Sequence, residues 1–170
     1  MDELKTARCI LRPIAAGVVE RLHEIFTSPG VRRYLWDGEI IPIERTRFVV
    51  ELSERMFRDE RFGLWGAWQA DTLIGFTGLW RFREPPDLEL LYGLAEPSWG
   101  RGHATEIARA IVDYCFETLD MPVVRASTDV GNAKSTRVLD RLGFRFDRRA
   151  TVGGLDTVFY EVTRRRSGQG

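Results

Sequence analysis

The sequence predicts a mixed α/β fold built around one central sheet. Strand-like runs such as 88–94 and 157–162 alternate along the chain with longer segments whose apolar residues recur at helical spacing. The expected element order is β-α-α-β-β-β-α-β-α-β-β, with no internal repeat and no linker. We therefore expect a single domain over residues 1–170, in which 164–170 form a tail.

The expected helices and strands follow from residue spacing and from turn residues. Helices are expected at 15–27, 43–59, 104–119 and 133–142. Strands are expected at 7–13, 64–68, 73–80, 88–94, 122–128, 144–147 and 157–162. The stretch Thr27-Ser28-Pro29-Gly30 should end the first helix, and Ala70-Asp71 should form a hairpin turn. Asn132 is a suitable N-cap for the last helix.

Composition and charge exclude several classes of partner. The chain has 25 basic and 25 acidic residues, so it has no net field to attract nucleic acid or an anionic membrane. Cys9 and Cys115 are expected to be buried apolar side chains, and no His/Cys spacing indicates a metal site. There is no apolar signal segment and no run long enough to span a membrane. We expect a cytoplasmic protein, monomeric or homodimeric, without metal, nucleic acid or membrane partners.

The stretch from Pro97 to Glu106 predicts a phosphate-binding turn. Gly100, Gly102 and Ala104 place small residues at alternate positions between a strand and a helix. Small residues let the main chain approach a ligand, and the N–H groups at a helix start face its negative charge. The stretch lacks the lysine of a P-loop and the third glycine of a dinucleotide fingerprint.

This stretch resembles the pyrophosphate loop of the GNAT superfamily of N-acetyltransferases, Gln/Arg-x-x-Gly-x-Gly/Ala. Gly102 and Ala104 occupy its small positions, while Trp99 stands where Gln or Arg is usual. The run Trp-Gly-x-Gly-x-Ala-Thr-Glu is similar to the RimJ/RimL-like (ribosomal-protein-alanine acetyltransferase) branch, as is the segment 132–144 with its Asn-x-x-Ser and Leu-Gly-Phe. The resemblance implies the GNAT fold, a twisted, mixed but mostly antiparallel sheet of about seven strands flanked by about four helices.

The resemblance also implies a reaction and a set of binding residues. The acetyl group of acetyl-CoA would pass directly to a primary amine, of either a small molecule or a protein N-terminus. The coenzyme's diphosphate would bind the main chain of the loop, and its pantetheine arm would lie between strand 88–94 and strand 123–128, which a bulge at Gly93 would hold apart. The expected coenzyme-binding residues are Tyr92, Leu94, Gly100, Arg101, Gly102, His103, Ala104, Thr105, Asn132 and Ser135.

Two residues are candidates for the chemistry itself. An ammonium has no lone pair, so the acceptor amine must lose a proton before it attacks, and Glu89 is the expected base at its binding site. The alternatives are that Glu89 points outward from its strand or that Asp87 acts instead. Ser135 is expected to donate a hydrogen bond or proton to the leaving thiolate, unless it is an ordinary first-turn helix residue. Tyr92 is a further donor candidate.

Other residues and functions remain open. Trp36 lies in a polar connector and is the expected acceptor contact among several aromatic residues, Tyr34, Trp65 and Trp80 being the others. His103 is expected to be exposed, and His23 is expected to have no partner. The same fold could also serve as an acyl-CoA-binding or regulatory module without turnover, and a nucleotide-binding domain is a third possibility.

Overall fold

One open mixed sheet organises the protein. The structure is a computed structural model that describes residues 3–82 and 88–164, and within these residues eight strands lie in the order β1-β2-β3-β4-β5-β6-β8-β7. The strands are β1 (Leu4–Lys5), β2 (Ile10–Pro13), β3 (Leu64–Gln69), β4 (Thr72–Arg81), β5 (Leu88–Leu94), β6 (Val123–Asp129), β7 (Arg145–Val152) and β8 (Leu155–Thr163). The helices are α1 (Val19–Thr27), α2 (Pro29–Leu35), α3 (Ile43–Glu60), α4 (His103–Glu117) and α5 (Ala133–Arg141). Two short 3-10 turns, η1 (Ala16–Val18) and η2 (Glu96–Ser98), complete the described elements. The predicted mixed α/β class is confirmed.

The element order also agrees with the prediction, apart from two additions. β1 is a two-residue strand that pairs with β2 at the edge of the sheet, too short to leave a recognisable sequence pattern. α2 begins at Pro29, where the sequence indicated only a break. Proline is favoured in the first turn of a helix because its missing N–H has no intrahelical partner there anyway. Ser28 therefore ends α1 and starts α2 at once.

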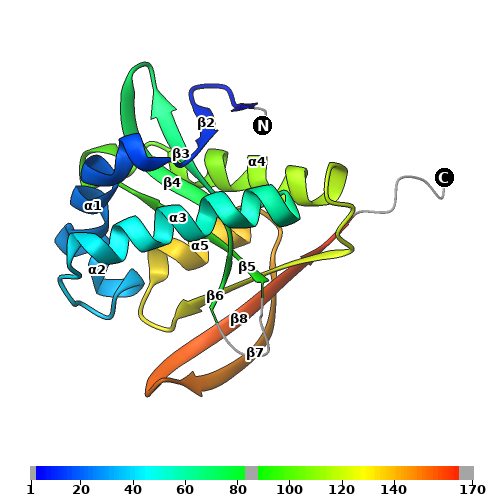
Figure 1. Ribbon diagram of the computed structural model, residues 1–170. Helices are drawn as coiled ribbons and strands as arrows, with labels where there is room; N and C mark the ends of the chain where they lie inside the picture. Colours follow the sequence, from blue (N-terminus) through cyan, green and yellow to red (C-terminus); the bar gives the residue numbers. More distant parts are fainter. Residues whose placement is uncertain (1–2, 83–87, 165–170) are drawn as a thin grey trace.

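Helices cover both faces of the sheet. Successive side chains of a strand point to opposite faces, and the core accordingly divides into two clusters. One contains Leu64 and Phe76 with residues of α1, α2 and the first half of α3, helices that lie side by side in Figure 1. The other contains Trp65 and Leu90 with residues of α4, α5 and the end of α3. The middle of the sheet, β3 to β5, is thus buried between the two helical layers, whereas β7 is mostly exposed.

The sheet is forked between β5 and β6. β5 pairs with β4 along its whole length, but in the described strands β5 and β6 share the single parallel pair Glu89↔Arg125. The separation expected at this point is present, whereas the expected bulge at Gly93 is wrong. The β4–β5 register runs through Phe76↔Gly93 without a shift. A Cβ atom at Gly93 would lie 2.5 Å from the Phe76 ring, so the glycine makes room for that ring.

Several local predictions are confirmed and one lies at the edge of the described chain. The β3–β4 hairpin turns at Ala70-Asp71, and both Cys9 and Cys115 are buried. The expected tail at 164–170 falls outside the described residues except for Arg164, whose side chain bonds Asp120 at 2.6 Å.

Candidate active site

The glycine-rich loop presents main-chain N–H groups at the start of α4. Gly100 and Gly102 both have left-handed backbone conformations, with φ of 73° and 79°, which favour glycine. Gly102 is the N-cap of α4 and supplies no side chain to bond the first N–H groups of the helix. A Cβ atom at Gly100 would meet nothing within 4 Å, and one at Gly102 would meet only Arg8. The turn is therefore open on the side that a ligand would approach.

An N-terminal segment holds this loop from behind. One carboxylate oxygen of Glu106 accepts bonds from the Thr6 hydroxyl at 2.6 Å and from the Arg8 main-chain N–H at 2.7 Å. The other accepts a 2.7 Å bond from Arg8 Nε, while Arg8 Nη1 donates to the Arg101 carbonyl at 2.7 Å. Burial alone would raise the pKa of Glu106, but these hydrogen bonds and the Arg8 charge outweigh it and lower that pKa. We call Thr6, Arg8 and Glu106 the loop clamp.

The side chain of His103 is not exposed as expected. It is 2% exposed and lies against Cys9, with 3.8 Å between Nδ1 and Sγ. Burial lowers the pKa of His103, and the charge of Arg8 lowers it further, so the imidazole is neutral near pH 7. Only the main chain of His103 remains to face a ligand at the loop. His23 also has a partner, since its Nδ1 lies 2.9 Å from the Thr46 hydroxyl.

Trp99 connects the loop to β5 and α5. Its indole Nε1 donates to the Leu94 carbonyl at 2.8 Å, and Lys134 Nζ lies 3.8 Å from its ring centroid. The ring also fills the space beside Gly30, where a Cβ atom would lie 2.1 Å from it. This residue departs from the usual loop pattern, and it brings a lysine of α5 to the edge of the loop.

The main chain of β5 faces the fork at Tyr92 and Leu94. Hydrogen-bonded and non-hydrogen-bonded pairs alternate along an antiparallel ladder. Ala95 N–H bonds the Ile74 carbonyl of β4, so the main-chain groups one and three residues earlier point away from β4. The Leu94 N–H therefore points into the space between β5 and β6, as the predicted contact with a thioester requires.

Tyr92 and Ser135 meet on one side of the fork. Their hydroxyl oxygens are 2.8 Å apart, and both side chains are partly buried. Burial raises the pKa of Tyr92 to about 12, so the phenol keeps its proton at neutral pH. Asn132 accepts a 3.2 Å bond from Ser135 N–H through Oδ1, which confirms the predicted N-cap and leaves its amide NH2 group as a donor. The structure thus brings together three of the predicted site residues.

Glu89 is buried at the base of the fork. Its side chain is 2% exposed, so the alternative of an outward-pointing carboxylate is wrong. Ser127 of β6 donates a 2.5 Å hydrogen bond to Glu89 Oε2 across the fork. The competing candidate Asp87 lies outside the described residues. Because Glu89 and Tyr92 are three positions apart on a strand, their side chains lie on opposite faces of the sheet.

A cavity of about 300 Å³ lies on the Glu89 face of the sheet. Trp80, the cross-strand neighbour of Glu89, and Leu91, two residues further along β5, belong to its wall. The cavity is lined by Phe26, Leu35, Trp36, Arg45, Phe48, Val49, Leu52, Leu64, Trp80, Arg81, Phe82 and Leu91. Trp36 is thus placed where an acceptor could bind, as is Trp80.

The other two aromatic candidates lie elsewhere. Trp65 packs in the core between Phe57 and Tyr114, and the Tyr34 hydroxyl donates to the Gly131 carbonyl at 3.3 Å.

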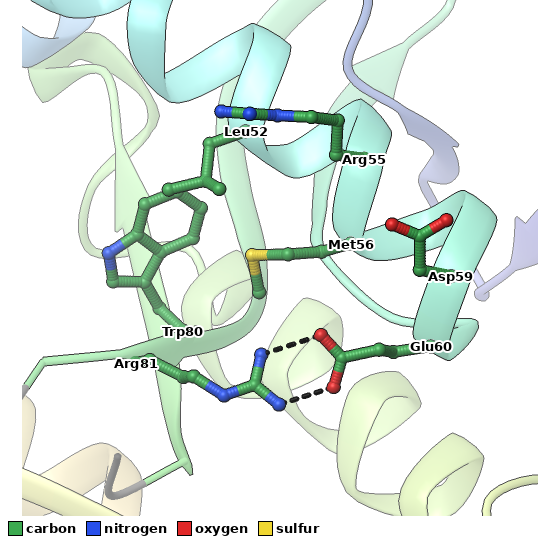
Figure 2. A pocket seen from close by; sticks show the side chains of 7 residues that line it. All are labelled: Leu52, Arg55, Met56, Asp59, Glu60, Trp80 and Arg81. Carbon is green, nitrogen blue, oxygen red and sulfur yellow. Dashed lines mark hydrogen bonds and ion pairs between the residues drawn. The ribbon is translucent and has the colours of Figure 1, made fainter. Parts of the chain in front are cut away.

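A second hollow of about 270 Å³ adjoins the cavity and shares Leu52, Trp80 and Arg81 with it. Figure 2 shows the Trp80 ring beside Leu52 and Met56, and Arg81 in a two-pronged ion pair with Glu60. The remaining lining residues of this hollow are Arg55 and Asp59. The ion pair balances the Arg81 charge at the boundary between the two hollows.

In residues 3–82 and 88–164 no three His, Cys, Asp or Glu side chains come together in a way that could hold a metal ion. No helix in the same residues combines the length and apolar character needed to cross a membrane.

The match to a family model identifies the family of the chain. The model described as the acetyltransferase (GNAT) domain matches residues 8–145, which include the loop, the fork and α5. The chain belongs to the GNAT acetyltransferases. The predicted superfamily is therefore confirmed.

Known GNAT relatives cover most of the chain. It is 28% identical over 144 residues to the uncharacterized N-acetyltransferase YoaA of Bacillus subtilis (strain 168), covering 83% of this chain and 81% of YoaA. A crystal structure of an acetyltransferase from Agrobacterium tumefaciens str. C58 superposes with a TM-score of 0.83 at 26% identity, covering 96% and 95% of the two chains. RimL, a ribosomal L7/L12 alpha-N-protein acetyltransferase solved with coenzyme A, superposes with a TM-score of 0.81 at 16% identity, covering 95% and 98%. The last of these shows similarity of fold.

The geometry of this GNAT domain fits acetyl-CoA, the acetyl donor that the family implies. The open loop and the uncapped start of α4 suit a diphosphate, and the fork offers main-chain groups to an amide-containing arm. In addition, the Thr105 hydroxyl oxygen is buried without a hydrogen-bond partner in the described part of the chain. A buried hydroxyl of this kind costs free energy until a ligand or water satisfies it.

Three features of the site were not predicted from the sequence. They are the loop clamp, the bond from Ser127 to Glu89 across the fork, and the two arginines in the cavity wall, Arg45 and Arg81. In the clamp, Glu106 lies about a hundred positions from Thr6 and Arg8, and no local pattern connects it with them.

Proposed function

We propose that this GNAT domain transfers the acetyl group of acetyl-CoA directly to a primary amine. The observation that carries the proposal is the fork between β5 and β6, which opens next to the glycine loop and has Glu89 at its base. An arm that entered the fork would have the loop at its phosphate end and Tyr92 with Ser135 near its reactive end. These positions support a path for the coenzyme from the loop to Tyr92 and Ser135.

The loop and the fork hold the donor in this proposal. The N–H groups from Gly100 to Thr105 bind its diphosphate, helped by the dipole of α4. The Asn132 amide binds the pantetheine arm, and the Leu94 N–H polarises the thioester carbonyl as negative charge develops on its oxygen. Acetyl-CoA supplies an activated acyl group, and the protein's contribution is to position it.

In this proposal the two proton transfers take place on opposite faces of the sheet. On the cavity face, Glu89 takes the proton that the attacking amine loses, directly or through a water molecule. On the opposite face, Ser135 with Tyr92 donates a hydrogen bond or proton to the sulfur as the C–S bond breaks. The new C–N bond forms between them, at the fork. Because the phenol pKa is about 12, Tyr92 is a proton donor and not a base at neutral pH.

The acceptor is a small-molecule amine or a protein N-terminus. The RimJ/RimL-like motifs and the fold similarity to RimL support a protein N-terminus. The cavity beside Glu89, at about 300 Å³, is also of a size that accepts a small molecule. The contact expected for either acceptor is Trp36.

Coenzyme binding and thiol release test this proposal together. We expect calorimetry to detect acetyl-CoA binding, and free thiol to appear with amines from a panel that includes peptides beginning with Ser, Thr or Ala. Gly102→Trp should abolish binding because its side chain fills the diphosphate position. Gly154→Trp is a matched control, since Gly154 has a similar φ of 82° and a Cβ atom there would meet nothing within 4 Å in the distant β7–β8 turn.

Three other results would each contradict the proposal. Unchanged binding by Gly102→Trp would remove the loop from the coenzyme site. Binding without thiol release on the whole panel would indicate an acyl-CoA-binding module instead. Equal competition by ATP would indicate a nucleotide-binding domain.

A further inference from the structure

We infer that the acceptor amine carries an apolar or aromatic body and a carboxylate group that binds at Arg45 and Trp36. This inference rests on the proposed acetyl transfer and names the class of acceptor. It comes from the lining, charge and unsatisfied donor of the cavity beside Glu89.

The cavity wall selects an apolar body. Ten of its twelve lining residues are apolar or aromatic, and the two exceptions are both arginines. Phe26 and Trp36 pack edge to face with ring centroids 5.6 Å apart, and Phe48 is 45% exposed although it borders the cavity. Burying the apolar surface of a ligand against such a wall removes it from water and therefore stabilises binding.

The charge at the cavity is positive. Arg81 is balanced by its ion pair with Glu60. Arg45, by contrast, makes no ion pair with any described carboxylate, and its guanidinium lies 5.9 Å from the Trp36 ring centroid and 5.7 Å from that of Phe48. No acidic side chain of the described residues lines the cavity. An acceptor with several ammonium groups would be repelled here, whereas a carboxylate would find a cation on an aromatic platform.

Trp36 adds a second donor at the same end. Its Nε1 atom is buried and has no hydrogen-bond partner among the described residues. An indole N–H can only donate, so it needs an acceptor oxygen from a ligand or water. The Arg45 guanidinium lies 5.9 Å from the Trp36 ring centroid, and in this inference one acceptor carboxylate binds both residues.

The two ends of the cavity match the two ends of such an acceptor. Trp80 and Leu91 line the cavity beside Glu89, while Trp36 and Arg45 come from the connection after α2 and from α3. The amine therefore points toward Glu89 and the carboxylate toward Arg45. In this orientation Glu89 removes the proton of the amine at one end, and Arg45 balances the charge of the carboxylate at the other.

Paired acceptors test the inference. We compare 4-(aminomethyl)benzoate with benzylamine, and L-phenylalanine with phenethylamine, measuring kcat/KM for thiol release with acetyl-CoA. Each acid should be preferred over its partner without a carboxylate by roughly 10-fold or more, the size of a charge-assisted bond to a partly exposed arginine. Spermidine should be a poor acceptor.

Variants identify the residues responsible. Arg45→Met keeps an apolar stem over the rings and removes the charge, so it should raise KM for the acids and reduce their preference to about 3-fold or less. Trp36→Phe should also raise KM for the acids, with little effect on benzylamine. Arg47→Met is the matched control, because Arg47 lies on the same helix outside the cavity and should leave the preference unchanged.

Each contrary outcome overturns the inference in a recognisable way. Equal rates for the acids and their partners without a carboxylate, or equal losses in Arg45→Met and Arg47→Met, would exclude a carboxylate site. If peptides with an amidated C-terminus were acetylated faster than the two acids, the acceptor would be a protein N-terminus and the inference would be wrong. If coenzyme binds but no amine is acetylated, the proposed transfer fails. Calorimetry with 4-(aminomethyl)benzoate then tests whether the cavity binds a carboxylate. If this compound does not bind, or binds Arg45→Met as well as the wild-type protein, the carboxylate site is excluded.

Discussion

Replacing Glu106 by glutamine should destabilise the protein and weaken coenzyme binding at the same time. The carboxylate receives bonds from the Thr6 hydroxyl and from Arg8, and Arg8 in turn holds the Arg101 carbonyl of the loop. A glutamine amide can still accept on one side, but its NH2 group would face the donors of Arg8. The loop clamp would therefore lose its charged half.

The expected magnitude follows from the contacts. A hydrogen bond to a charged group contributes about 1.5–3 kcal/mol, and the pair is discounted because the Arg8 side chain is 44% exposed while Glu106 is 14% exposed. We take about 2 kcal/mol, which for a domain of this size corresponds to a fall in Tm of about 4–8 °C. Glu3→Gln is the control: it removes an exposed pair with Arg12 and should change stability by less than about 0.5 kcal/mol.

The pH dependence gives the decisive assay. The folded pKa of Glu106 is lowered from 4.5, so its contribution is present above that value and is lost as pH falls through the folded pKa. The gap in Tm between the wild-type protein and Glu106→Gln should be full at pH 7 and narrow below about pH 4.5. The reasoning is refuted if the two proteins melt together at pH 7, or if the gap is the same at pH 7 and pH 3.5.

Three further predictions concern the fork. Glu89→Gln should lower kcat by roughly 10²-fold or more while acetyl-CoA affinity stays within a factor of three, and unchanged turnover would remove Glu89 from the mechanism. Tyr92→Phe should lower kcat by a similar factor at pH 7 and pH 9, since its pKa of about 12 keeps it protonated at both; a loss confined to pH 9 would contradict this role. Gly93→Ala should destabilise the fold by about 1–3 kcal/mol because the new methyl group would clash with Phe76. Urea denaturation measures this against Gly17→Ala, whose methyl group would meet nothing within 4 Å, and equal stabilities of the two variants would disprove the packing argument.

Features that depend on short stretches of chain could be predicted from the sequence. The loop before α4, the Asn132 cap and the order of the main elements each leave a local pattern of small, polar or periodic residues. The resemblance to the GNAT superfamily, which the family model confirms, rested on two such patterns. α2 was missed because its first residue, Pro29, both ends one helix and begins the next.

Side-chain direction could not be predicted where the local pattern is ambiguous. Strand β5 reads Leu-Glu-Leu-Leu-Tyr-Gly-Leu and has apolar residues on both faces, so nothing in it shows whether Glu89 is buried. His103 occupies a variable position of the loop motif, and its burial depends on Cys9, 94 residues away. The fork itself depends on how β5 and β6 approach each other, a tertiary property without a sequence signal.

The single pair between β5 and β6 leaves a seam through the sheet. On one side lie β1 to β5, on the other β6, β8 and β7, and main-chain pairing crosses the seam in the described sheet only at Glu89 and Arg125. An arm that bonded both strands would act as a removable ninth strand, so that saturation with ligand at about 100 times Kd would add roughly 2.7 kcal/mol to the stability of the whole domain. The bound coenzyme would then hold β5 and β6 together through main-chain hydrogen bonds, and its release after each turnover would remove these bonds from the sheet.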